Sequence, residues 1–194
     1  MLLTSTLEGS GRKLPKIIPD ISNKNVLCIP TAAYAEEGYE NWLPSEQRDV
    51  KEFCKSYREF DLKDKSEEDL KNAIQDIDII YCTGGNTYVL LEWMKKTNFK
   101  STLDSFFERG GIYIGSSAGS IVIGPDIEFV GDIDDRSKSD ITDLSGLGYI
   151  HFYILPHMNN PKFADALKPE IEKLKAASKE VKLLNDDEYI WLKN

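Results

Sequence analysis

Ser117 lies in the segment Gly115–Gly119, which has the pattern Gly-x-Ser-x-Gly. The apolar run Gly111–Ile114 precedes this segment, and a second apolar run, Ile121–Ile123, follows it. A strand, a tight glycine turn and a helix in this order form a nucleophile elbow, in which the serine hydroxyl projects from the carboxyl end of the strand. The two glycines leave space beside the serine. We therefore predict that Ser117 is a nucleophile.

A turn made of small residues also has uses without chemistry. It can bind an anion at the start of a helix, or it can simply connect a strand to a helix. The pattern alone leaves these alternatives open. Catalysis by Ser117 requires a base, an acid and an oxyanion site elsewhere in the chain.

The base is expected to be one of the two histidines. His157 follows the apolar run 149–155 and stands between Pro156 and Pro161, which end regular structure. On a loop at a strand end, its imidazole can accept the serine proton and pass it to the leaving group. His151 lies inside the apolar run, and we interpret it as a strand residue.

The acid is harder to select, because carboxylates are numerous near both positions. Asp186 follows the strand-like run Val181–Leu184, so we expect it, like His157, at a strand end. It is our first choice for the group that orients the histidine and stabilises the imidazolium. Most of the carboxylates between Ser117 and His157 are expected to face solvent.

An oxyanion site is expected in the loop Thr83–Thr87, which follows the apolar run Ile77–Cys82. Ligands of parallel α/β sheets bind at the carboxyl ends of strands, where this loop and the serine turn would meet. The backbone amides of Gly85 and Ala118 are candidate oxyanion donors. Asn86, in the same loop, is a candidate substrate-binding residue. A Gly-Gly-Asn segment is also typical of a tight turn without a ligand.

The elements that position these residues alternate along the chain. Strands are predicted at 1–4, 25–30, 60–62, 77–82 and 111–114, and helical patterns at 38–57, 66–74 and 88–94. The apolar run at 25–30, which ends in a proline, is typical of a strand buried on both faces, and we interpret 77–82 as another buried strand. The alternation predicts one three-layer α/β domain over residues 1–194, with a mainly parallel sheet and helices on both faces.

Composition limits the classes of partner. Lys and Arg total 24 against 33 Asp and Glu, which gives a formal net charge of -9. Such a surface repels phosphate backbones and anionic lipids, so neither nucleic acid nor a membrane is an expected partner. We recognise no signal peptide or apolar run of membrane-spanning length. Three widely spaced cysteines predict a reduced, cytoplasmic protein, and no ligand spacing predicts a metal or another cofactor.

Five motifs occur in a characteristic order over nearly the whole chain. They are Leu3-Thr4-Ser5, Ile29-Pro30-Thr31-Ala32, Gly84 to Thr87, Gly115 to Gly119 and Pro156-His157. In these motifs the sequence resembles the family of serine peptidases that includes aspartyl dipeptidase (peptidase E) and cyanophycinase. The resemblance implies a fold akin to class I glutamine amidotransferases and a metal-free mechanism that uses a serine, a histidine and an acid.

The resemblance assigns roles to individual positions. Ser117 matches the nucleophile, His157 the base, and Asp186 falls where we align the third triad carboxylate. Gly85 and Ala118 match the oxyanion amides.

Family members also have a functionally important aspartate between the nucleophile and the histidine. We take Asp140 as its counterpart, with Asp135 and Asp143 as the alternatives.

One departure from the family pattern concerns specificity. The residues after His157, 158–163, lack the arginine-bearing stretch that grips an N-terminal aspartate in the dipeptidase. A guanidinium is the natural clamp for a substrate carboxylate, so the preference for aspartate is left open. Arg136 and Lys162 are the candidate replacements.

The sequence thus predicts a serine peptidase that hydrolyses small peptides through an acyl-enzyme, with dipeptides of the Asp-Xaa type among the candidate substrates. Two alternatives stay open. One is another acyl or amide hydrolase that uses the same triad, and the other is a non-catalytic relative that binds a small ligand. The oligomeric state, a homodimer included, is also open.

Overall fold

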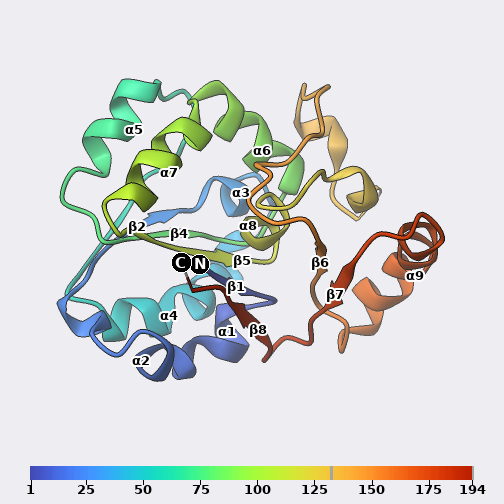
Figure 1. Ribbon diagram of the computed structural model, residues 1–194, viewed down its shortest axis with the longest axis horizontal. Helices are drawn as coiled ribbons and strands as arrows, with labels where there is room; N and C mark the ends of the chain where they lie inside the picture. Colours follow the sequence, from blue (N-terminus) through green and yellow to red (C-terminus); the bar gives the residue numbers. More distant parts are fainter. Residues whose placement is uncertain (132, 194) are drawn as a thin grey trace.

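A six-stranded sheet forms the centre of the computed structural model, which describes residues 1–131 and 133–193 without the side chain of Lys162 (Figure 1). The strand order is β3-β2-β4-β5-β1-β8. The first five strands run parallel to their neighbours, and β8 runs antiparallel to β1. The bounds of the strands are β1 Leu2–Thr4, β2 Asn25–Ile29, β3 Ser56–Glu59, β4 Ile79–Cys82, β5 Ile112–Ser116 and β8 Tyr189–Trp191.

Helices cover both faces of this sheet (Figure 1). One face carries α5 (Glu67–Ala73), α6 (Thr87–Lys96) and α7 (Phe99–Glu108), and the other carries α1 (Leu7–Ser10), α2 (Leu14–Ile17) and α4 (Leu43–Phe53). Successive strand residues point to opposite faces, so Ile80 packs into the first core and Ile79 into the second. The predicted three-layer α/β fold with a mainly parallel sheet is confirmed. Within the described ranges, no helix combines the length and the apolar character needed to cross a membrane.

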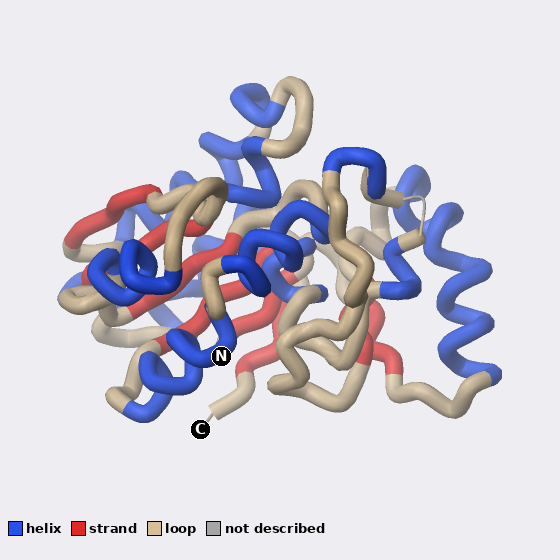
Figure 2. The backbone as a smooth tube through the Cα atoms, turned by 90° about the horizontal axis from the view of Figure 1, so that it is seen from above, coloured by secondary structure: helices blue, strands red, loops and turns tan. Residues whose placement is uncertain are grey.

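A second, two-stranded sheet lies beside the first (Figures 1 and 2). It pairs β6 (Tyr153–Leu155) in parallel with β7 (Val181–Leu183), and α9 (Pro161–Ala176) connects them. The strand expected over 149–155 is therefore shorter than predicted. Our interpretation of His151 as a strand residue is wrong, because it precedes β6 with its side chain 84% exposed, 3.2 Å from a carboxylate oxygen of Glu180.

The segment 38–62 also differs from expectation. The helix α4 ends at Phe53, and the next strand, β3, spans Ser56–Glu59 rather than 60–62. This strand lies at the edge of the sheet and is mostly exposed, so it lacks the apolar run by which the buried strands are recognised. Its conformation comes from pairing with β2, which local sequence does not reveal.

The first and last described segments meet in the middle of the molecule. The pairing of β1 with β8 brings Met1 beside Leu192, and the Met1 ammonium donates a hydrogen bond of 2.7 Å to the Leu192 carbonyl. The strands β1 and β8 lie side by side in the sheet (Figure 1). As a result, residues just after β1 and just before β8 are neighbours.

Candidate active site

Ser117 connects the end of β5 to the short helix α8 (Ala118–Ile121) through a strained backbone. Its φ of 45° and ψ of -110° are rare for a residue with a side chain. The turn is held by a hydrogen bond of 3.1 Å from the Ser117 amide to the Thr4 carbonyl, and the Ser117 carbonyl accepts from the amides of Ser120 and Ile121. A serine with strained backbone angles between a strand and a helix is what the predicted nucleophile elbow requires.

His157 reaches Ser117 from the loop that follows β6. The distance from His157 Nε2 to Ser117 Oγ is 2.9 Å. The loop is fixed to the end of β7, because the Met158 amide donates to the Leu184 carbonyl and the Leu184 amide donates to the Leu155 carbonyl. The small second sheet therefore places His157 beside Ser117.

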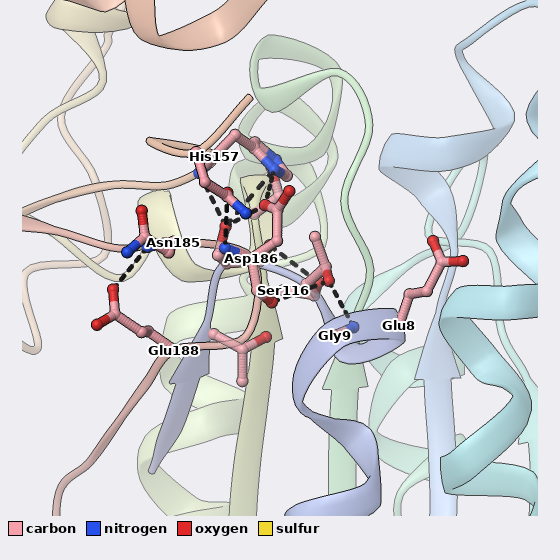
Figure 3. Close-up of polar contacts among 12 residues, drawn as sticks. Glu8, Gly9, Ser116, His157, Asn185, Asp186 and Glu188 are labelled. Atoms are coloured by element: carbon pink, nitrogen blue, oxygen red, sulfur yellow. Dashed lines mark hydrogen bonds and ion pairs between the residues drawn. The ribbon is translucent and has the colours of Figure 1, made fainter. Parts of the chain in front are cut away.

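Asp186 contacts the other ring nitrogen of His157, and Figure 3 shows the two residues side by side. Its Oδ1 is 2.7 Å from His157 Nδ1. An ionised carboxylate only accepts hydrogen bonds, so Nδ1 carries the proton and Nε2 is free to accept from Ser117. The aspartate is itself anchored, since its amide donates to Asn159 Oδ1 at 3.0 Å. The structure thus aligns the three residues predicted as nucleophile, base and acid.

Ser5 joins the acid to the main chain of the histidine. Its hydroxyl donates to Asp186 Oδ1 at 2.9 Å and accepts from the His157 amide at 2.8 Å. The side chain is buried at the end of β1. The sequence motif contained Ser5 but did not indicate this contact.

Glu46, on α4, is a buried carboxylate beneath the site that sequence reasoning missed. Its Oε1 accepts from the Leu7 amide at 2.9 Å and from the Ser116 hydroxyl, and its Oε2 accepts from the Glu8 amide at 3.1 Å. It therefore satisfies two free amides of α1 and ties that helix to β5. Burial raises the pKa of the Glu46 carboxyl. A signal did exist, because Glu46 is four residues before Val50 and so shares its buried helix face.

The glycine loop after β4 packs directly against the nucleophile. A Cβ atom on Gly84 would lie 3.1 Å from Ser117 Cβ. Gly85 has a φ of 123°, and a Cβ there would lie 2.2 Å from the Ala32 carbonyl oxygen, so only glycine fits. Neither the Gly85 amide nor the Ala118 amide donates a hydrogen bond to another described residue. Both donors are thus available to a ligand.

The two predicted substrate-binding residues do not face the site. Asn86 is fully buried and caps α6: its Oδ1 accepts from the Val89 amide, and its Nδ2 donates to Glu36 and to a main-chain carbonyl. Its amide group is thus fully used within the fold. Arg136 is exposed, with its guanidinium 5.7 Å from the Tyr88 ring centre. The side chain of Lys162 lies outside the described residues.

The segment between Ser117 and His157 brings a different aspartate to the site from the one predicted. Asp140 is exposed, and Asp143 pairs with Lys95 at 2.5 Å on the surface. Asp135 caps a short turn by accepting from the Ser137 amide. Asp134, by contrast, lines the cavity beside Ser117, and burial raises its pKa.

A cavity of about 590 Å³ opens at Ser117 and His157. Its lining combines carboxylates with apolar side chains, and none of the described lining residues is a lysine or an arginine. The carboxylates are Glu8, Glu36, Glu37, Glu46 and Asp134. Among the described residues, no group of three or more His, Cys, Asp or Glu side chains is arranged to hold a metal ion.

Comparison with known proteins identifies the family to which this chain belongs. The model of peptidase family S51 matches residues 1–194. An uncharacterized peptidase of Listeria monocytogenes, Lmo0363, is 28% identical over 166 residues, which cover 85% of this chain and 80% of that protein. Peptidase E of Escherichia coli is 30% identical over 95 residues, 49% of this chain and 38% of that protein. The crystal structure of a candidate peptidase E protein from L. monocytogenes is similar with a TM-score of 0.86 and 26% identity, and covers 98% of this chain and 92% of that one.

Proposed function

Because this chain belongs to peptidase family S51, we propose that it is a serine peptidase that hydrolyses small peptides with Ser117, His157 and Asp186 as its triad. One observation carries the proposal, the continuous hydrogen-bond chain of 2.9 Å from the serine to the histidine and 2.7 Å from the histidine to the aspartate. A serine, a base and an orienting acid in this sequence of contacts activate the hydroxyl for acyl transfer.

Acylation begins when Ser117 Oγ attacks the carbonyl carbon of the scissile peptide. His157 Nε2 accepts the hydroxyl proton, and Asp186 stabilises the imidazolium that results. The carbonyl electron pair moves to oxygen. The free amides of Gly85 and Ala118 are the donors that we assign to this oxyanion.

The tetrahedral intermediate then collapses. The carbon–nitrogen bond breaks, and the imidazolium of His157 transfers its proton to the departing amine. Water attacks the acyl-enzyme with His157 as base, and the acid product and free Ser117 are released.

The charge of the cavity supports a peptide with a free amino terminus. Asp134 accepts a hydrogen bond of 2.8 Å from the Thr87 amide and has no salt-bridge partner among the described residues. We assign it to the substrate ammonium, and thereby to the role of the family aspartate for which the sequence favoured Asp140. Among the lining residues whose side chains the structure describes, none is a lysine or an arginine that could clamp an aspartate side chain, so the proposal does not specify Asp-Xaa as the substrate.

Labelling with a fluorophosphonate tests the nucleophile. We expect an adduct on Ser117, located by mass spectrometry, and its loss in the His157→Ala protein. Ser117→Ala should abolish both labelling and hydrolysis of a dipeptide panel, whereas Ser101→Ala, an exposed serine on α7, should change neither. Full hydrolysis by Ser117→Ala would contradict the proposal. Cleavage of esters without any peptide would favour another acyl hydrolase.

The proposed location and partners rest on the cysteines and on the net charge. Three cysteines, Cys28, Cys54 and Cys82, are free, which supports the cytoplasm as the proposed location. The net charge of -9 supports a small peptide rather than nucleic acid or a membrane as the partner. A homodimer stays a prediction.

A further inference from the structure

We infer that the amino-terminal residue of the preferred substrate carries an apolar side chain. This inference rests on the proposed function and names the substrate class of the same site. It starts from one wall of the cavity that the mechanism above does not use.

The wall is built from three separate elements. It consists of one residue of α8, two of the short 3₁₀ helix η4 (Glu128–Val130), the nearby Ile133 and two of α9. We call it the apolar wall, and its residues are Ile121, Phe129, Val130, Ile133, Phe163 and Leu167. An apolar side chain placed against it loses contact with water, which favours binding.

The apolar wall begins at the reacting groups themselves. Ile121 is one helical turn after the nucleophile, and its amide donates to the Ser117 carbonyl at 2.9 Å. At the other end, the ring of Phe163 lies 4.7 Å, centre to centre, from the imidazole of His157. A side chain adjacent to the scissile carbonyl therefore meets apolar surface.

The position of Asp134 decides which substrate residue uses this wall. Asp134 directly follows Ile133 in the chain and lines the same cavity. If the aspartate holds the substrate ammonium, the side chain on the same substrate residue lies beside Ile133 and its neighbours in η4. The apolar wall thus contacts the side chain of the substrate residue that carries the amino terminus.

The remaining carboxylates of the cavity do not offer an interior site for a basic side chain. Glu46 is occupied by two amides and a hydroxyl, and Glu36 pairs with Lys138 at 3.2 Å. Glu8 and Glu37 are exposed at the cavity rim. An acidic substrate side chain would be repelled by all of these groups.

A panel of dipeptides with alanine in the second position tests the inference. We expect kcat/KM for Leu-Ala and Met-Ala to exceed that for Gly-Ala by roughly 10- to 100-fold, the range expected for burial of one apolar side chain. Asp-Ala and Lys-Ala should be poorer than Leu-Ala. A preference for Asp-Ala or Lys-Ala would overturn the inference.

Two matched substitutions on α9 localise the effect. Leu167 and Ile171 are both buried, at 3% and 6% exposure, but only Leu167 belongs to the apolar wall. Leu167→Ala should lower the Leu-Ala to Gly-Ala ratio of kcat/KM about fivefold or more, and Ile171→Ala should leave the ratio unchanged. The ratio is measured on one preparation, so partial unfolding of either variant cancels. An unchanged ratio in Leu167→Ala would refute the role of the wall.

The same experiments separate failure of the inference from failure of the proposed function. A protein that is labelled at Ser117 and hydrolyses the dipeptides, but prefers a charged or glycine amino-terminal residue, refutes the apolar preference alone. A protein that is labelled but hydrolyses none of the panel refutes both the apolar preference and peptide hydrolysis. A protein that is neither labelled nor active refutes the proposed function.

Discussion

Replacement of Ser5 by alanine tests whether the triad depends on a residue that never touches the reacting atoms. The substitution removes a hydrogen bond to Asp186 Oδ1 at 2.9 Å, one from the His157 amide at 2.8 Å, and a longer contact of 3.5 Å with His157 Nδ1. His157 has a φ of 64°, a left-handed conformation that costs a non-glycine residue about 1 kcal/mol, so its backbone needs such support.

The size of the effect follows from the two shorter hydrogen bonds. A hydrogen bond to a charged carboxylate contributes about 1.5–3 kcal/mol, and one between neutral groups about 0.5–1.5 kcal/mol. The lost stability is therefore about 2–4 kcal/mol. The histidine becomes charged in the transition state, where the hydrogen bond from Ser5 to the Asp186 carboxylate supports it. If the free-energy contribution of this bond is lost there, kcat falls roughly 10- to 100-fold. KM should change little, because the hydroxyl faces the triad.

The assay is steady-state hydrolysis of a cleaved dipeptide, with thermal unfolding measured in parallel. Ser10→Ala is the matched control, since Ser10 is also buried and donates to the Thr6 carbonyl, but contacts no triad member. It should lower stability with kcat nearly unchanged. An unaltered kcat in Ser5→Ala, or an equal loss in Ser10→Ala, would refute the reasoning.

Three further predictions concern carboxylates. Asp186→Asn should lower kcat by about 10⁴ in the same assay, as loss of the orienting acid does in such triads, whereas a normal rate, or an equal loss in Asp140→Asn, would argue against Asp186. Asp134→Asn should raise KM for free dipeptides roughly tenfold but not for their N-acetyl forms, and equal changes would exclude the ammonium contact. The pKa of Glu46 is raised in the fold, so its protonation stabilises the protein at acidic pH and this contribution is lost as pH rises through the folded pKa. The free energy of unfolding, measured with denaturant from pH 4 to 8, should fall less with rising pH in Glu46→Gln than in the unsubstituted protein. Identical pH profiles would contradict this.

The sequence indicated the three candidate triad residues because each follows a strand-like run. Ser117, His157 and Asp186 come after β5, β6 and β7, and strand ends are where α/β folds gather ligands. The peptidase family suggested by the ordered motifs is confirmed. What local patterns could not indicate is that β6 and β7 form a sheet of their own, since short apolar runs reveal strands but not partners.

The contacts that local sequence does not indicate join distant parts of the chain. The hydroxyl of Ser5 bonds to a carboxylate 181 positions away, and that of Ser116 to Glu46, 70 positions away. Asn86 was assigned to substrate because it sits in a glycine loop, but asparagine before a helix is also a strong N-cap, and the helical pattern after it was visible. Asp134 was one of many acids in a loop without periodicity.

The place of β1 in the sheet has a consequence for when the candidate site is completed during folding. β1 lies between β5 and β8, which both come from much later in the chain. Contacts of such long sequence separation form slowly. Until β1 is inserted, the Thr4 carbonyl cannot hold the serine turn, and Ser5 cannot join the histidine to the aspartate. The alignment of Ser117, His157 and Asp186 is therefore expected to be completed late in folding, once β1 has entered the sheet.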